Sequence, residues 1–467
     1  MKSNRLVFVG LCALACSMFS SPADDITASG SGEWGSTVPD APWPNGIVPG
    51  TNDSVDVEAP FVVTITTNAT AGYVYGSGTI TLAPDATLTL RGDEFGAQGA
   101  QSLSTLNATA PGSTVIYEGN AFWAKRTDYF HLIFRNLSTN QYDFFNGAIP
   151  GSGPVPMNIA GDLSVLGRIK VQQGADIFVG GDLIMGTNSS WDVSSFNLTV
   201  TSNTTMRGLL LDLDGASGSN YFGGNMLIGS DSIGWNISDV IQWGVGGSLT
   251  NDNLIVGRGY GSITFAGSGV ITGKPIRIPT MTVSGSYLIG TTITLTTNTP
   301  TLTGNLIFDL ANTNQLILQS YPTNPLTLYY DGNLNVINTG AVPTPGTTYK
   351  FFSATNYDGA FDLQTFPPLP VGLAWEDNLL TSGSITVSGS VATPPMITST
   401  QYDRATRALT LVWTSSPAMT YSVIYSATLP GSFGTVLASG IPSGGAQTST
   451  AVTLPAGDTG FVRVLQE

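Results

Sequence analysis

Short apolar runs that alternate with polar residues fill most of the chain. Between positions 163 and 180, "LSVLGRIKVQQGADIFVG" contains three such runs separated by glycine-containing corners. Their period of two predicts strands with Ile169, Val171, Ile177 and Val179 facing inward. Helical periodicity is nearly absent, and its best candidate, residues 94–106, is interrupted by glycines that favour a loop. The pattern predicts an all-β chain.

A short motif marks the start of these runs and sets their period. Gly followed by Asp, Asn or Ser and an apolar alternation begins at positions 161, 181, 224, 247, 285, 304 and 332. The intervals correspond to one or two coils of about 19–23 residues. Three strands per coil predict a right-handed parallel β-helix, because a coil that cannot bury its apolar face alone buries it against its neighbours.

A different rhythm begins after the adjacent Pro394 and Pro395. Longer strands, separated by Gly, Ser and Pro at hairpin spacings, predict a small antiparallel β-sandwich over residues 393–467. We therefore expect a β-helix domain over residues 24–392, with an N-terminal entry segment and closing coils at 340–392.

Residues 1–23 have the features of a secretory signal peptide. Lys2 and Arg5 precede a 14-residue apolar run and a small-residue cleavage site. Cys12 and Cys16, the two cysteines of the chain, lie inside this segment, so the mature chain has no thiol for a disulfide. Lipidation of Cys16 is the alternative to simple cleavage.

Charge and hydropathy exclude some classes of partner. Without its first 23 residues the chain has 14 basic and 31 acidic residues and a net charge of −17. Such a surface makes nucleic acid an unfavourable partner. No later stretch is long and apolar enough for a transmembrane segment in the mature chain.

Four segments resemble modules of secreted, repeat-rich bacterial surface proteins. Residues 32–57 hold two tryptophans and a Val-Pro-Gly turn, and "YFHLIF" leads to "PMNIAGDLSV" further on. Residues 346–387 are similar to the closing coils of proteins with autotransporter-associated β-strand repeats, in their Leu-Pro-x-Gly-Leu-x-Trp and Gly-x-Ile-x-Val elements. The C-terminal strands resemble a fibronectin-type-III-like module. The resemblance implies export and a surface role and supplies no active site.

Asp162 and Asp182 occupy the same motif position in successive coils. Stacked one rung apart they would lie ~5 Å from each other, the separation of a retaining glycosidase pair. The same motif position elsewhere holds Asn or Ser, which share with Asp the ability to accept backbone N–H groups. We therefore predict turn-capping residues at Asp162 and Asp182 and also at Asn225, Ser248, Ser286, Asn305 and Asn333.

Other residues that could carry chemistry are isolated in the sequence. His131, the only histidine, lies within an apolar strand, and no Gly-x-Ser-x-Gly motif accompanies it. Arg168 and Lys170 belong to an "RIK" element like that of polygalacturonases, but the acidic and histidine elements of such enzymes are absent. The sequence assigns no catalytic residue.

Two further sets are weak candidates for binding. Asp212 and Asp214 would lie ~7 Å apart on one strand face, a separation compatible with calcium ligands or an inverting carboxylate pair. A solvated strand face is the favoured interpretation, since no third acidic ligand is nearby. Trp191, Trp235 and Trp243 are candidates for glycan contact, with packing in the core as the favoured alternative.

Together these features predict an exported, non-catalytic β-helix protein that acts as a cell-surface, adhesive or matrix-associated element. Its expected partner is an extracellular polysaccharide or a surface protein, and no cofactor or resident metal is expected. A polysaccharide lyase or glycoside hydrolase on the same scaffold is the alternative.

Overall fold

The chain folds into two compact units. Unit 1 comprises Met1–Gly340, Lys350–Phe366 and Leu379–Ser384, and unit 2 comprises Ala341–Tyr349, Pro367–Asn378 and Ile385–Glu467. The computed structural model describes residues 24–91, 103–118, 124–125, 127–136, 145–148, 156–193, 195–211, 218–232, 234–237, 242–253, 255–257, 261–296, 299–319, 326–390, 394–417, 419–429, 432–457 and 459–467.

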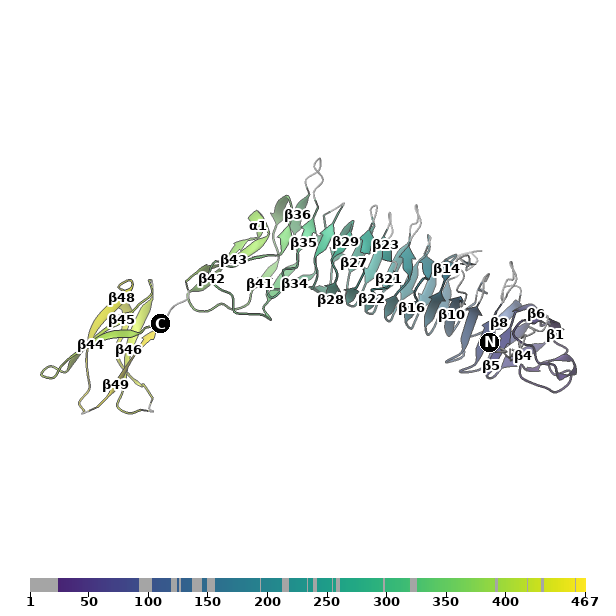
Figure 1. Cartoon of the computed structure of the whole chain (residues 1–467), viewed down its shortest axis with the longest axis horizontal. Helices are drawn as coiled ribbons and strands as arrows, with labels where there is room; N and C mark the ends of the chain where they lie inside the picture. The colour runs from purple at the N-terminus through teal and green to yellow at the C-terminus, as the bar shows by residue number, and fades with distance from the viewer. Residues whose placement is uncertain are drawn as a thin grey trace, which may run out of the picture. The chain divides into compact units, whose positions relative to one another are not determined.

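Unit 1 is a parallel β-helix whose strands form three long sheets of 14, ten and eight strands. Figure 1 shows these strands stacked side by side in chain order, from purple to green. Through the middle of the chain, neighbours within a sheet are three elements apart, so each coil adds one strand to each sheet. Hydrogen bonds between adjacent coils there join residues 20 to 23 positions apart, in agreement with the predicted coil length.

The 14-stranded sheet contains, in spatial order, β5 (Asn68–Ala71), β7 (Thr87–Leu90), β9 (Thr114–Glu118), β10 (His131–Asn136), β13 (Leu163–Gly167), β16 (Leu183–Met185), β19 (Thr204–Met206), β22 (Met226–Ile228), β25 (Leu249–Asn251), β28 (Ser268–Gly273), β31 (Ser286–Ile289), β34 (Asn305–Asp309), β37 (Asn333–Ile337) and β41 (Leu363–Thr365). The ten-stranded sheet contains β11 (Phe145–Ala148), β14 (Ile169–Gln172), β17 (Ser190–Asp192), β20 (Leu209–Leu211), β23 (Gly234–Ile237), β26 (Ile255–Gly257), β29 (Ile276–Ile278), β32 (Ile293–Leu295), β35 (Leu316–Leu318) and β39 (Phe352–Ser353). The eight-stranded sheet contains β12 (Met157–Ile159), β15 (Ile177–Val179), β18 (Leu198–Val200), β21 (Ser219–Phe222), β24 (Gln242–Val245), β27 (Ser262–Phe265), β30 (Thr280–Val283) and β33 (Thr301–Leu302).

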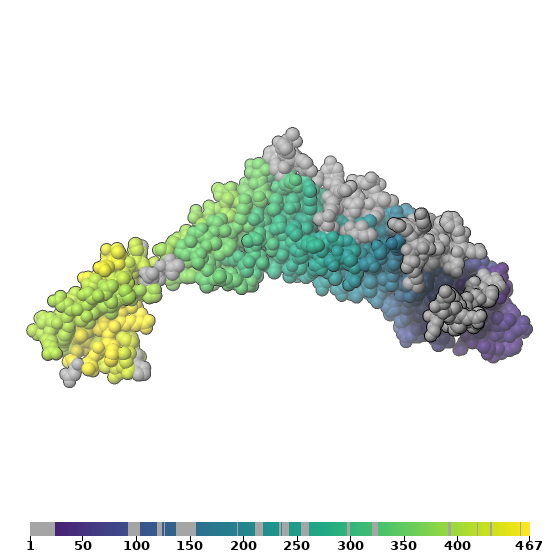
Figure 2. Space-filling model, viewed as in Figure 1, coloured from purple at the N-terminus to yellow at the C-terminus, as the bar shows by residue number. Residues whose placement is uncertain are grey.

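The core of unit 1 lies inside the coils, where the alternating apolar side chains of all three sheets meet. Ile169, Val171, Ile177 and Val179 are buried, as the period of two predicts. In the space-filling view of Figure 2 the colour of this unit changes gradually from purple to green, because the coils follow one another in chain order. Stacking therefore supplies the core that no single coil could form.

The coils begin with a six-stranded sheet of parallel strands. Its spatial order is β1 (Asp25–Thr27), β3 (Ser54–Asp56), β6 (Tyr73–Leu82), β4 (Val62–Ile65) and β2 (Gly32–Glu33), with β8 (Leu103–Asn107) on a second edge of β6. Trp34 and Trp43, which flank the turn before the 3-10 helix η1 (Pro44–Gly46), are both buried with ring centroids 5.1 Å apart. The two tryptophans of the entry segment are thus core residues.

Two short sheets and one helical turn are formed by residues 327–389. β36 (Thr327–Tyr330) pairs with β40 (Asn356–Gly359), and β43 (Ser384–Gly389) lies between β38 (Thr348–Lys350) and β42 (Leu373–Asn378). The single described α-helix, α1 (Leu379–Ser382), has four residues. Among the described residues, no helix has the length and apolar character needed to span a bilayer.

Unit 2 contains a small antiparallel β-sandwich. One sheet places β45 (Ala408–Thr414) between β44 (Ile397–Asp403) and β48 (Gln447–Thr453), and the other places β46 (Thr420–Ser426) between β47 (Thr435–Pro442) and β49 (Phe461–Gln466). Trp413 and Tyr421, one from each sheet, are fully buried and pack edge to face at 5.8 Å. The predicted order of a parallel β-helix followed by an antiparallel sandwich is confirmed.

Candidate functional site

Polar side chains at one corner of the β-helix form a hydrogen-bonded ladder between consecutive coils. Asp162 Oδ1 accepts the backbone N–H of Asp182 at 2.8 Å, and Asp182 Oδ1 accepts that of Asn203 at 2.9 Å. Asn203 Oδ1 then accepts the N–H of Asn225 at 3.0 Å, and Asn225 Oδ1 that of Ser248 at 2.9 Å. The two carboxylates therefore hold backbone groups of the next coil, as the asparagines do.

The prediction that these residues accept backbone N–H groups is confirmed for the Asp pair, for Asn225 and for Ser248. The donor belongs to the following coil, however. The side chains therefore link neighbouring coils and do not cap a turn within their own coil. Asn203 is a member that the sequence motif missed, because Ser202 replaces the motif glycine. Asn203 lies 21 residues after Asp182, which is one coil length, so the coil period would have identified it.

The prediction is wrong for Ser286, Asn305 and Asn333. The last ladder bond is the one that Ser248 Oγ accepts from the N–H of Val270 at 3.1 Å. The strand β28, which contains Val270, begins earlier in its coil than its predecessors. Ser286 lies two residues before the partner of Val270 and is out of register with the ladder. The N–H groups of these three residues bond to backbone carbonyls of the preceding coil at 2.7–2.8 Å. The side chains of Ser286 and Asn305 instead bond to each other, with Asn305 Nδ2 donating to Ser286 Oγ at 3.0 Å.

His131 stands at the start of the ladder. Its Nδ1 accepts the backbone N–H of Asp162 at 2.9 Å. A nitrogen that accepts this bond carries no proton, so the 3.7 Å approach of Asp162 Oδ2 to the same Nδ1 is not an ion pair. In a Ser-His-Asp triad the carboxylate would instead accept a hydrogen bond from a protonated Nδ1. The geometry is that of a strand histidine that bonds to backbone, as predicted.

The imidazole of His131 also explains the glycine of the first ladder motif. A Cβ on Gly161 would lie 2.5 Å from Cε1 and 2.6 Å from Nδ1 of His131. A side chain there would force the imidazole to move, and the carbonyl oxygen of Phe130 lies 3.0 Å from the same Cβ position. Packing against the preceding coil therefore favours glycine at position 161.

The three tryptophans considered for glycan contact lie inside the coils. Trp191, Trp235 and Trp243 are each 1% exposed or less. Trp243 stacks on Phe222 with centroids 6.0 Å apart and meets Trp235 edge to face at 5.2 Å. The glycan-platform hypothesis is therefore wrong for these residues, because no ring face reaches solvent. The alternation of Trp243 with the inward Val245 already favoured this packing.

The remaining sequence candidates do not form a cluster. Asp212 and Asp214 lie outside the described residues, so the calcium and inverting-pair hypotheses for them stay predictions. Lys170 lies in register with Ser190, as the coil period predicts, and with Asn146 on the other side. Within the described ranges, no group of three or more His, Cys, Asp or Glu side chains could hold a metal ion.

An ion-paired column joins three consecutive coils of the 14-stranded sheet. Glu118, at the end of β9, lies between Arg91 and Arg135. Its Oε1 is 3.3 Å from Nη2 of Arg91, and its Oε2 pairs with Nη2 of Arg135. The carboxylate is almost fully buried, and two guanidinium partners compensate for the loss of hydration. We assign this column to the stability of the coils.

The outer face of the eight-stranded sheet differs from the other two faces in charge. None of its eight strands contains a charged residue or a histidine. The 14-stranded sheet contains the ion-paired column and His131, and the ten-stranded sheet contains Lys170, Asp192 and Arg277. One uncharged face therefore runs along a protein whose net charge is strongly negative.

Two large aromatic side chains project from this uncharged face. Phe178 on β15 is 49% exposed and Tyr221 on β21 is 40% exposed. The sequence pattern alone did not single out either residue, although each occupies the outward position of an alternating strand. Their alignment depends on the lengths of the intervening coils, which the motif spacing left ambiguous.

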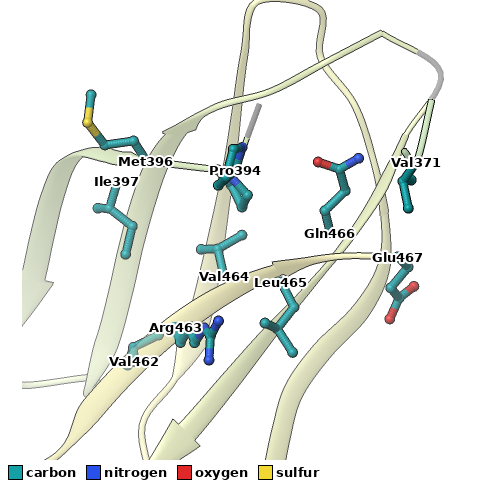
Figure 3. Close-up of a pocket in the computed structure, with 11 residues that line it drawn as sticks. Val371, Pro394, Met396, Ile397, Val462, Arg463, Val464, Leu465, Gln466 and Glu467 are labelled. Carbon is teal, nitrogen blue, oxygen red and sulfur yellow. The ribbon is translucent and has the colours of Figure 1, made fainter. Parts of the chain in front are cut away.

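Unit 2 has a shallow pocket of about 660 Å³. Figure 3 shows its lining, in which Val371 and Met396 are joined by residues of the last strand, β49. The lining is mainly aliphatic, and Arg463 and Glu467 are its charged members. These side chains do not form a cluster of polar groups that could bind or transform a ligand, so we assign the pocket no ligand.

The chain matches no protein-family model, and no curated protein or solved structure compared with it matches either.

Proposed function

We propose that this protein is an exported, non-catalytic β-helix element that binds a partner at the cell surface or in the extracellular matrix. The observation that carries the proposal is the ladder at Asp162 and Asp182. The repeated carboxylates that most resembled a glycosidase pair are engaged with backbone N–H groups. The scaffold thus uses them for stability, and the outer faces of its sheets are available for contact.

Three further features support a binding role. Residues 1–23 have a signal-peptide pattern, which accounts for export. The uncharged face offers the same strand spacing over eight coils, which suits a repetitive partner. The C-terminal sandwich, with its resemblance to a fibronectin-type-III-like module, serves as an accessory contact or attachment domain.

The test compares binding with turnover on the same substrates. We expect the full-length mature chain to be retained by at least one insoluble polysaccharide or surface-protein preparation without releasing reducing ends or unsaturated products. The panel contains neutral glycans and polyuronates. Turnover that is lost in Asp212→Ala or Asp214→Ala would show that the protein is a hydrolase or lyase.

A further inference from the structure

The outward positions of the eight-stranded sheet form one continuous column along the helix axis. Phe178 on β15 pairs in register with Thr199 on β18, and Thr199 pairs with Tyr221 on β21. With ~4.8 Å between neighbouring strands, the two aromatic residues lie ~10 Å apart with a threonine between them. Asn158 precedes this group on β12.

The backbone beneath Tyr221 leaves room for the ring to lie against the sheet. A Cβ on Gly244, the residue paired with Tyr221 in the next coil, would lie 2.6 Å from Cδ2 of Tyr221. A Cβ on Gly246 would lie 2.6 Å from its hydroxyl oxygen. The ring thus covers two glycines with one face, and with 40% of the residue exposed its other face is open to solvent.

We infer that Phe178, Thr199 and Tyr221 form a binding site for a neutral polysaccharide that lies along the helix axis. Alternate pyranose rings stack on the two aromatic side chains. Thr199 exchanges hydrogen bonds with the sugar hydroxyl groups around it. Asn158, whose Nδ2 donates to Asp128 Oδ1 at 3.2 Å, accepts hydrogen bonds from them through its Oδ1. This inference rests on the proposed binding function and names the class of ligand.

The absence of charged residues on the strands of this face favours a neutral polymer. A polyuronate would require cations along the column, and none of the strands that form it has one. Two charged residues lie at its border. Asp128 accepts the backbone N–H of Asn158 at 3.0 Å and Asp176 accepts that of Asn197 at 2.8 Å, and both carboxylates would repel a carboxylated chain. The remaining outward positions of the column are Gly244 and the threonines Thr264, Thr282 and Thr301.

The experiment measures retention of the full-length mature chain on insoluble β-linked glucan, chitin and xylan, with polygalacturonate as the charged comparison. We expect binding to at least one neutral polymer, and dissociation constants about tenfold higher in Phe178→Ala and in Tyr221→Ala. Tyr221→Phe keeps the ring and retains binding. Tyr329→Ala is the matched control, because Tyr329 is an exposed aromatic on β36 in another sheet.

Melting temperatures of all variants separate loss of binding from loss of fold. Unchanged retention of Phe178→Ala and Tyr221→Ala on a neutral polymer would overturn this site and leave the proposed function intact. Retention on polygalacturonate alone, or on none of the polymers, would overturn the assignment of a neutral ligand. Release of reducing ends would instead overturn the non-catalytic function.

Discussion

At the scale of single residues, the position after the corner glycine shows how one hydrogen-bonding requirement is met by different side chains. Asp162, Asp182, Asn203 and Asn225 all use Oδ1 to accept the N–H group one coil later. Only this oxygen is common to them, so the negative charge of Asp is dispensable. The chemistry of the motif is that of an acceptor between coils.

The first prediction concerns this acceptor. Asp162→Asn and Asp182→Asn should leave the melting temperature and polysaccharide retention nearly unchanged, because Asn supplies the same oxygen. Asp182→Ala removes the acceptor of the Asn203 N–H and should lower the free energy of unfolding by about 1 kcal/mol. Thermal denaturation followed by circular dichroism measures both. An Asn variant as unstable as the Ala variant would show that the charge matters.

At the scale of elements, the start of a strand decides whether the ladder continues. Up to β25 each strand begins directly after its ladder residue, and the side chains stay in line. β28 begins at Ser268, two residues before Val270, whose N–H donates to Ser248 Oγ. From β28 onward the corner hydrogen bonds pass to backbone carbonyls. β28 thus begins three residues before Ile271, the partner of the first residue of β25, and the type of corner contact changes after it.

The turn after β34 gives a prediction about pH. The carboxylate of Asp309 accepts N–H groups of Ala311 and Thr339, each at 3.0 Å, and the Thr339 hydroxyl. Burial raises the pKa of Asp309, but these hydrogen bonds outweigh burial and leave the pKa below its ordinary value of 3.8. A lowered pKa stabilises the fold above that ordinary value, and the contribution is lost as the pH falls through the lowered pKa.

We therefore expect Asp309→Asn to reduce the free energy of unfolding at neutral pH by about 1 kcal/mol. The difference from the wild type should narrow as the pH falls below 3.8 and disappear once the wild-type carboxyl is protonated. Melting curves recorded across this range measure the effect, with Glu376→Gln, an exposed carboxylate, as the control. A deficit that persists in acid would contradict the assignment to Asp309 ionisation.

At the scale of the whole molecule, the two units have separate hydrophobic cores. The core of unit 1 is continuous through its coils, whereas the sandwich of unit 2 is built around Trp413, Tyr421 and Val423. The units are joined by crossings of the chain near residues 340–390. Separate cores predict separate unfolding.

Calorimetry of the full-length mature chain should show two transitions. Trp413→Ala deletes the largest side chain of the sandwich core and should destabilise that unit by about 3–5 kcal/mol, moving one transition and leaving the other in place. The exposed Tyr329→Ala is the control and should move neither. One cooperative transition that shifts as a whole would mean that the two units unfold together.

The sequence by itself determined the all-β class, the coil length, the inward residues such as Val171 and Val179, and the acceptor role of Asp162 and Asp182. These follow from the alternation within each strand and from a motif that recurs at the coil length, and both are visible in the sequence. Tertiary structure decided the shift at β28 and the alignment of Phe178 with Tyr221. Each of these depends on register between coils of unequal length, and register is fixed only when the coils stack.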